Sequence, residues 1–172
     1  MDGDGYVDVT ANPFVLWRVG EEAARFAEEV GGVTKIVTVE TGGVPIATMS
    51  AYQLGVPLVV ARKRRIGNGW VGHEWIVNFE VRGFYVKAGS IRRNERVLIV
   101  DDVARSGVTV YQLSKLVRKF KAIVAGAFIL VGVGECEEKL RRLVGNLFPV
   151  KVLLRVHPSS GVKRRRRAAP VD

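Results

Sequence analysis

VLIVDDVARSGVT, residues Val97 to Thr109, is the stretch from which the fold and the site can be predicted. Four apolar residues predict a buried strand, and Asp101 and Asp102 follow it directly. Two adjacent carboxylates at the end of a buried strand cost free energy unless they are neutralised or hydrogen-bonded. They therefore indicate a ligand, although an acidic pair that only forms a turn and a helix cap is the alternative.

The second half of this stretch, Ala104 to Thr109, is a small loop that leads into a predicted helix. Backbone N–H groups at a helix N-terminus attract anions, and the hydroxyls of Ser106 and Thr109 add donors. Carboxylates accept hydrogen bonds from hydroxyls, and at most ~10 Å of chain separates them from the loop. A ligand with a vicinal diol and a phosphate fits this spacing, which points to ribose 5-phosphate. A Walker A loop, the rival phosphate motif, does not occur in the sequence.

Strands and helices alternate on both sides of this stretch. Predicted strands are 36–39, 57–61, 97–100, 123–131 and 150–156, and predicted helices are 13–30, 44–55, 110–120 and 135–147. This alternation predicts an α/β fold with a central parallel sheet and helices on both faces. Residues 62–72 are expected to form a loop, and 75–87 an antiparallel ribbon bent near Gly83. Ligands of such sheets bind beyond the carboxyl ends of the strands, here after residues 39, 61, 100 and 131, and the first three of these segments carry unusual residues.

Length and composition limit the organisation of the chain. The 172 residues, 48% of them hydrophobic, predict one globular domain at 1–156, followed by a basic, disordered tail at 157–172. A single Cys, Cys136, favours a reducing compartment, and no apolar run is long enough for a membrane span, so we expect a cytoplasmic protein. The net charge of +10 attracts anions, whether nucleic acid, acidic membrane surfaces or polyphosphate ligands.

The stretch from Val97 to Thr109 resembles the phosphoribosyl pyrophosphate (PRPP) signature of the type I phosphoribosyltransferases. In that family the acidic pair holds the ribose hydroxyls, which implies this role for Asp101 and Asp102. The loop that follows holds the 5′-phosphate, and the matching residues are Ala104, Arg105, Ser106, Gly107, Val108 and Thr109. The resemblance covers roughly residues 34–131 and is nearest to the adenine and xanthine enzymes.

Two further segments match places where this family binds pyrophosphate. One follows the first core strand and contains Glu40, Thr41, Gly42 and Gly43. Adenine enzymes typically have Arg where this chain has Gly42, so this loop favours an oxopurine over adenine. The other segment is the basic pair Arg62 and Lys63 after the second strand.

The resemblance implies a purine-salvage enzyme that transfers ribose 5-phosphate from PRPP to a nucleobase, giving a nucleoside monophosphate and pyrophosphate. It also implies Mg²⁺, held indirectly by Asp101 and Asp102 through PRPP, and a homodimer. Residues 62–87 correspond to the family's mobile hood loop, in which Trp70 and Trp75 either stack on a base or pack against the ribbon.

The sequence assigns neither a catalytic residue nor a base-binding residue. The hypoxanthine-guanine enzymes carry an Asp at the place of Arg105, where it can handle the proton of the base. The alternative function is a PRPP- or base-sensing regulator of the same fold that binds nucleic acid through the basic run Lys163 to Arg167.

Overall fold

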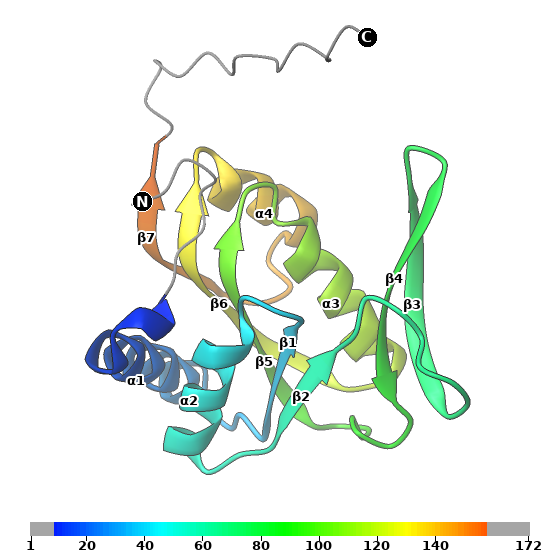
Figure 1. The fold of residues 1–172 in the computed structure, drawn as a ribbon, viewed down its shortest axis with the longest axis horizontal. Helices are drawn as coiled ribbons and strands as arrows, with labels where there is room; N and C mark the ends of the chain where they lie inside the picture. Colours follow the sequence, from blue (N-terminus) through cyan, green and yellow to red (C-terminus); the bar gives the residue numbers. More distant parts are fainter. Residues whose placement is uncertain (1–8, 158–172) are drawn as a thin grey trace, which may run out of the picture.

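A five-stranded parallel sheet forms the centre of the protein. The computed structural model describes residues 9–157, so the predicted basic tail lies almost entirely outside the described residues. The strand order is β2-β1-β5-β6-β7, and all four neighbouring pairs are parallel. The strands are β1 (Lys35–Val39), β2 (Leu58–Ala61), β5 (Arg96–Ala104), β6 (Ile123–Val133) and β7 (Val150–Val156). The predicted α/β class with a parallel sheet is confirmed (Figure 1).

Helices cover both faces of this sheet, as the sequence predicts. They are α1 (Pro13–Val30), α2 (Val44–Leu54), α3 (Val108–Lys119) and α4 (Cys136–Val144), and a short 3₁₀ turn, η1 (Val9–Ala11), precedes α1. One hydrophobic cluster joins α1 and α2 to Ile36 and Leu98, and a second joins α3 and α4 to Val37 and Ile99. Neighbouring residues of a strand therefore belong to hydrophobic clusters on opposite faces of the sheet, because successive strand side chains point to opposite faces.

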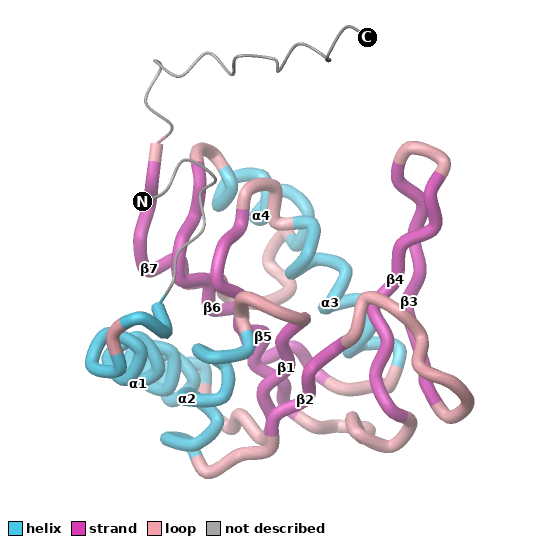
Figure 2. The backbone as a smooth tube through the Cα atoms, in the orientation of Figure 1, coloured by secondary structure: helices cyan, strands magenta, loops and turns pink. Residues whose placement is uncertain are grey.

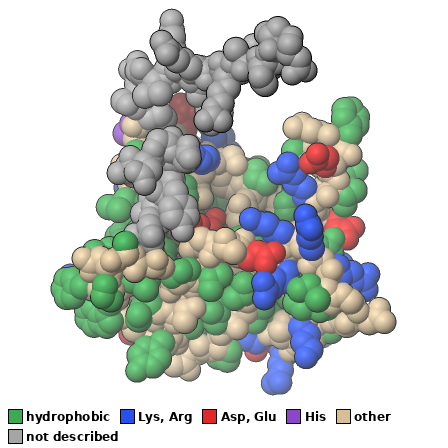
Figure 3. Space-filling model, viewed as in Figure 1, with side chains coloured by type: hydrophobic (Ala, Val, Ile, Leu, Met, Phe, Trp, Pro, Cys, Tyr) green, Lys and Arg blue, Asp and Glu red, His purple; other side chains and the backbone are tan. Residues whose placement is uncertain are grey.

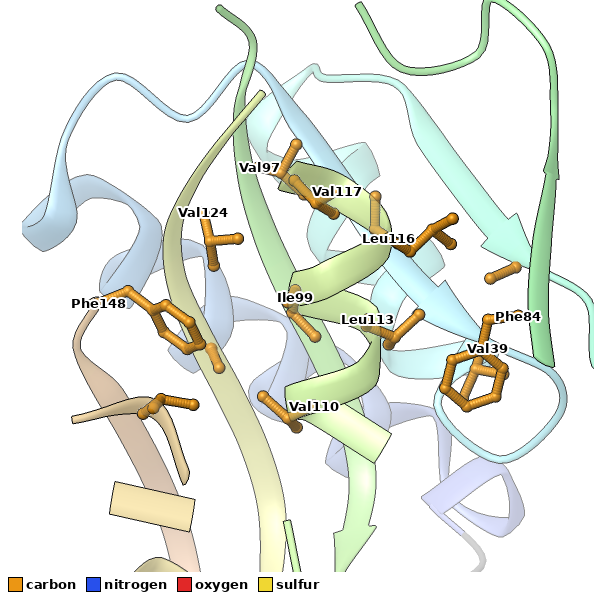
Figure 4. Close-up of a cluster of buried hydrophobic side chains, with 14 of the residues drawn as sticks. Val39, Phe84, Val97, Ile99, Val110, Leu113, Leu116, Val117, Val124 and Phe148 are labelled. Atoms are coloured by element: carbon orange, nitrogen blue, oxygen red, sulfur yellow. The ribbon is translucent and has the colours of Figure 1, made fainter. Parts of the chain in front are cut away.

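Helix α3 packs along the sheet directly after β5. Its apolar residues recur at helical spacing, and Val110, Leu113, Leu116 and Val117 are fully buried. Figure 4 shows these four side chains on the side of α3 that faces the strands. This packing fixes the N-terminus of α3 at the carboxyl end of β5.

A two-stranded antiparallel hairpin, β3 (Trp70–Val77) and β4 (Glu80–Lys87), stands beside the sheet (Figure 2). The predicted ribbon is confirmed, but its bounds were wrong: β3 begins within the segment expected to be a loop. The chain also turns at Asn78 and Phe79, both at positive φ (50° and 64°), and not near Gly83. A type I′ hairpin turn needs positive φ at both central residues, and Phe gives no sequence signal for that. Gly83 lies within β4 opposite Glu74.

Among residues 9–157, no helix has both the length and the apolar character needed to cross a bilayer.

Candidate functional site

The candidate site lies where β1, β2 and β5 reach the carboxyl edge of the sheet. Strand β5 continues through the acidic pair to Ala104, four residues beyond the predicted end at Val100. Successive residues of a strand point to opposite faces, so the two carboxylates are not equivalent. Asp101 is 4% exposed, whereas Asp102 is only partly buried.

Asp101 is an unusual carboxyl group. Its Oδ1 accepts a hydrogen bond from the backbone N–H of Asp102 at 3.1 Å, and its Oδ2 is buried without a partner among the described residues. Burial, together with the nearby charge of Asp102, raises the pKa of Asp101 to about 8. A neutral carboxyl at pH 7 can donate a hydrogen bond as well as accept one. Oδ2 of Asp101 is therefore able to form a hydrogen bond with a ligand.

Asp102 meets the loop that follows β1. A β-carbon on Gly42 would lie 2.0 Å from Oδ2 of Asp102, and one on Gly43 would lie 2.5 Å from Oγ1 of Thr38. Glycine at these positions leaves room for the Asp102 carboxylate and the Thr38 hydroxyl against the backbone of this loop. The fold thus brings the predicted diol-binding and pyrophosphate-binding segments, about sixty residues apart in sequence, into contact.

Glu40 makes its contacts within the protein. Its carboxylate accepts hydrogen bonds from Nη1 of Arg62 at 2.8 Å and from the backbone N–H of Lys63 at 2.7 Å. The hydrogen bond from Arg62 is the main cause that lowers the pKa of Glu40. The peptide bond between Glu40 and Thr41 is cis. Glu40 therefore ties the segment after β1 to the basic pair after β2.

The loop before α3 packs against α4 through Gly107 and Leu140. Gly107 is the N-cap of α3, with φ of 74°, and a β-carbon there would lie 2.6 Å from Cβ of Leu140. The Oγ of Ser106 accepts a long hydrogen bond, 3.5 Å, from the backbone N–H of Val108. Ser106 and Val108 are exposed, so this helix N-terminus is open to an anion.

A cleft of about 820 Å³ lies between this loop and the hairpin. Ser106, Val108 and Thr109 form one wall, Lys63 and Arg64 another, and residues of β3 and β4 the third. Trp75 lines the cleft and packs edge-to-face on Phe84, with ring centroids 4.8 Å apart. Trp75 thus packs against the ribbon, one of its two predicted roles, and also lines the cleft, where the other role stays a prediction.

The electrostatics of the site suit a polyanion that also carries hydroxyls. Lys63 and Arg64 line the cleft, and Figure 3 shows Lys and Arg side chains gathered where the hairpin meets the sheet. Within residues 9–157 no three His, Cys, Asp or Glu side chains come together as a ready metal site. Asp101 and Asp102 are the carboxylates of the site that suit a divalent cation shared with phosphate oxygens, the coordination that Mg²⁺ prefers.

The structure brings most of the predicted residues to one edge of the sheet, but not into one pocket. Ser106, Thr109 and Lys63 line the cleft, whereas Gly42 contacts Asp102 beside it. Sequence reasoning missed Thr38, whose Oγ1 is buried without a partner among the described residues. A single Thr in an apolar strand was the only available signal.

Comparison with known proteins is consistent with this geometry. Residues 8–153 match the family model described as the phosphoribosyl transferase domain. The chain is 34% identical to a xanthine phosphoribosyltransferase of Bacillus mycoides over 134 residues, which is 74% of this chain and 67% of that protein. It is 36% identical to the enzyme of the same name from Geobacillus thermodenitrificans, covering 74% and 68%. The crystal structure of adenine phosphoribosyltransferase from Thermoanaerobacter pseudethanolicus superposes with a TM-score of 0.75 at 23% identity, covering 86% of this chain and 84% of that one.

Proposed function

This chain belongs to the phosphoribosyl transferase family, and from that premise we propose that it transfers ribose 5-phosphate from PRPP to a purine base. The products are a purine nucleoside monophosphate and pyrophosphate. The observation that carries the proposal is the contact between Gly42 and Asp102, because it places the diphosphate loop against the diol-binding strand. The relatives named above are transferases by name, which favours the enzyme over a sensing regulator of the same fold.

We assign the 5′-phosphate of PRPP to the N-terminus of α3. The backbone N–H groups of residues 106–109 and the hydroxyls of Ser106 and Thr109 are its donors, and Arg105 adds a positive charge. Asp102 accepts hydrogen bonds from the ribose hydroxyls. Asp101, with its buried free oxygen, receives the second hydroxyl or orients Asp102 through the backbone N–H of residue 102.

Pyrophosphate is assigned to the loop Thr41 to Gly43 and to the basic pair. The loop offers backbone groups and the hydroxyl of Thr41 but no charge, and Lys63 supplies the charge that compensates the leaving group. Glu40 is a positioning residue here, because its carboxylate is already bonded to Arg62 and to the backbone of Lys63. Mg²⁺ bound by PRPP, with Asp101 and Asp102 nearby, would neutralise the diphosphate as it leaves.

Catalysis in this scheme is mainly positioning and charge stabilisation. The anomeric carbon becomes electron-poor as its bond to pyrophosphate breaks, and the nitrogen of the base forms the new bond. Closing the hairpin over the cleft would exclude water, which would otherwise compete with the base. A homodimer and a cytoplasmic location complete the proposal; both stay predictions from the family resemblance and the composition.

Xanthine is the first base to test, because the sequence relatives named above are xanthine enzymes and because Gly42 replaces the Arg that is typical of adenine enzymes. The protein is incubated with PRPP and Mg²⁺ and with xanthine, guanine, hypoxanthine, adenine, uracil or orotate separately, and nucleotide formation is measured. We expect turnover with an oxopurine. Absence of nucleotide with all six bases would rule out the proposed function.

A further inference from the structure

A second cavity lies at the base of the hairpin and is separate from the candidate site. Its volume is about 500 Å³, and it shares no lining residue with the larger cleft. Two cations, Arg65 and Lys119, line it together with the rings of Trp70, His73 and Tyr85 and the carboxylate of Glu74. Neither the acidic pair nor the loop before α3 contributes to it.

The path of the chain builds this cavity. Arg62 pairs with Tyr85 through two backbone hydrogen bonds of 2.8 and 2.9 Å. The chain then returns to the hairpin at Gly69, whose carbonyl accepts a hydrogen bond from the backbone N–H of Ala88 at 2.8 Å. Arg65 lies on the segment between these two attachments. From the other side, Nζ of Lys119, in the last turn of α3, donates to the carbonyl of Gly72 at 2.7 Å. Two elements thus bring cations to the same edge of β3.

Tyr85 forms an aromatic surface inside this cavity. A β-carbon on Gly72 would lie 2.3 Å from its ring, and one on Gly83 would lie 2.6 Å from its hydroxyl oxygen, so two glycines make room for the ring along the hairpin. The hydroxyl donates to Oε1 of Glu74, which leaves the second oxygen of that carboxylate as an acceptor. Trp70 adds a second aromatic wall.

The cations keep hydrogen-bonding capacity for a ligand. Arg65 is exposed and lines the cavity, so its guanidinium N–H groups are open to an anion. Lys119 uses one of its three N–H groups on Gly72. Guanidinium and ammonium groups are the usual protein ligands of phosphate, and aromatic rings stack on nucleobases.

From this combination we propose that the cavity at the base of the hairpin is a second ligand site, which binds a purine nucleotide. The phosphate contacts Arg65 and Lys119, the base stacks on Trp70 or Tyr85, and the free oxygen of Glu74 accepts a hydrogen bond from an amino group of the base. A cavity of this size holds one nucleotide, which distinguishes it from the long groove that a nucleic-acid strand requires. The proposal is independent of the transferase activity.

The test uses 8-azidoguanosine 5′-monophosphate as a photo-crosslinking probe on the full-length protein, with and without saturating PRPP and Mg²⁺. Without an acceptor base, PRPP occupies the candidate active site and leaves the second cavity free. Crosslinked peptides are identified by mass spectrometry, and the affinity for guanosine 5′-monophosphate is measured by calorimetry. The variants are Arg65→Ala and Trp70→Leu. The matched control is Lys115→Ala, which removes a cation of α3 that lies over the ring of Tyr111 and not in the cavity.

We expect crosslinks on the peptides that contain Trp70 or Tyr85, and we expect them to persist with PRPP. Arg65→Ala should weaken this binding at least about tenfold, since a charge-assisted hydrogen bond to phosphate is lost, while Lys115→Ala changes it little. The proposal is overturned if crosslinks occur only near residues 101–109, or if Arg65→Ala binds as the wild type does. Stronger binding of a single-stranded oligonucleotide than of the mononucleotide, lost in the same variant, would also overturn it.

Discussion

Gly42 lies so close to Asp102 that a β-carbon at position 42 would stand 2.0 Å from Oδ2 of the carboxylate. The atoms in the way belong to the end of a side chain, so Asp102 could rotate, but only by leaving its present place beside the loop. Any side chain at position 42 therefore changes where the carboxylate points. The loop after β1, to which we assign the diphosphate, and the end of β5, to which we assign the ribose hydroxyls, therefore depend on each other for their geometry.

Gly42→Ala should raise the KM for PRPP several-fold and leave the fold intact. The displaced Asp102 loses its contact with the ribose, while the buried core is unchanged. Steady-state kinetics with varied PRPP measure the effect, and circular dichroism checks folding.

The matched experiment for this pair is a double-mutant cycle with Asp102→Asn, which by itself should cut PRPP affinity and turnover several-fold or more. If Gly42 acts through Asp102, the double variant is no worse than the poorer single variant. Additive losses would contradict the coupling, and unchanged kinetics in Asp102→Asn would refute the ribose contact.

Gly107→Ala should both destabilise the protein and abolish the 5′-phosphate site. The left-handed backbone conformation costs a non-glycine residue roughly 1–2 kcal/mol, and the new methyl group also meets Leu140 of α4. Gly55→Ala is the control, because Gly55 is also left-handed, with φ of 65° and ψ of 29°, but no atom lies within 4 Å of the added carbon. Thermal unfolding and PRPP binding are measured for both variants. Equal effects in the two would show that contact with α4 is unimportant.

Asp101 should make the stability of the protein depend on pH. Its pKa is about 8 in the folded protein and near 3.8 in the unfolded chain, so the folded state binds a proton that the unfolded state releases between these values. The stabilisation from this group is therefore complete below pH 3.8 and is lost as pH rises towards 8.

Asp101→Asn removes this titration. Relative to the wild type, the variant's free energy of unfolding should increase steadily between pH 4 and pH 8, as measured by urea denaturation followed by tryptophan fluorescence. Parallel pH profiles for the two proteins would contradict the assignment of a buried, protonated carboxyl at position 101.

Glu40→Gln should weaken PRPP binding a few-fold without a large loss of stability. The carboxylate holds Arg62 at 2.8 Å and the backbone of Lys63 at 2.7 Å, and its removal frees the basic pair to move. Glu138→Gln on α4 is the control, because its contact with Arg142 is an exposed pair of 3.6 Å and Glu138 does not line the cleft. Isothermal titration calorimetry measures the affinity of both variants for PRPP. An unaltered affinity in Glu40→Gln would exclude the positioning role of Glu40.

Much of the fold could be predicted because its signals are local. Short apolar runs such as Val97 to Val100 define the strands, and the spacing of Val110, Leu113 and Val117 defines a helix. The hairpin was placed less well, since its turn at Asn78 and Phe79 uses a residue that ordinarily avoids positive φ. The hairpin is also stabilised by contacts with α3, such as the hydrogen bond of 2.8 Å between His73 and Gln112. Contacts of this kind produce no pattern in the sequence.

By itself the sequence determined the chemistry of this protein: a strand that ends in Asp101 and Asp102, followed by a loop with Gly107 at the start of a helix. These features depend on neighbouring residues, and local backbone preferences fix them. Only the tertiary structure decided that Asp101 is buried, with its pKa raised to about 8, while Asp102 lies against Gly42, and that Glu40 accepts a hydrogen bond from Arg62. Burial and contact between distant segments arise when the sheet assembles, so no stretch of sequence alone can express them.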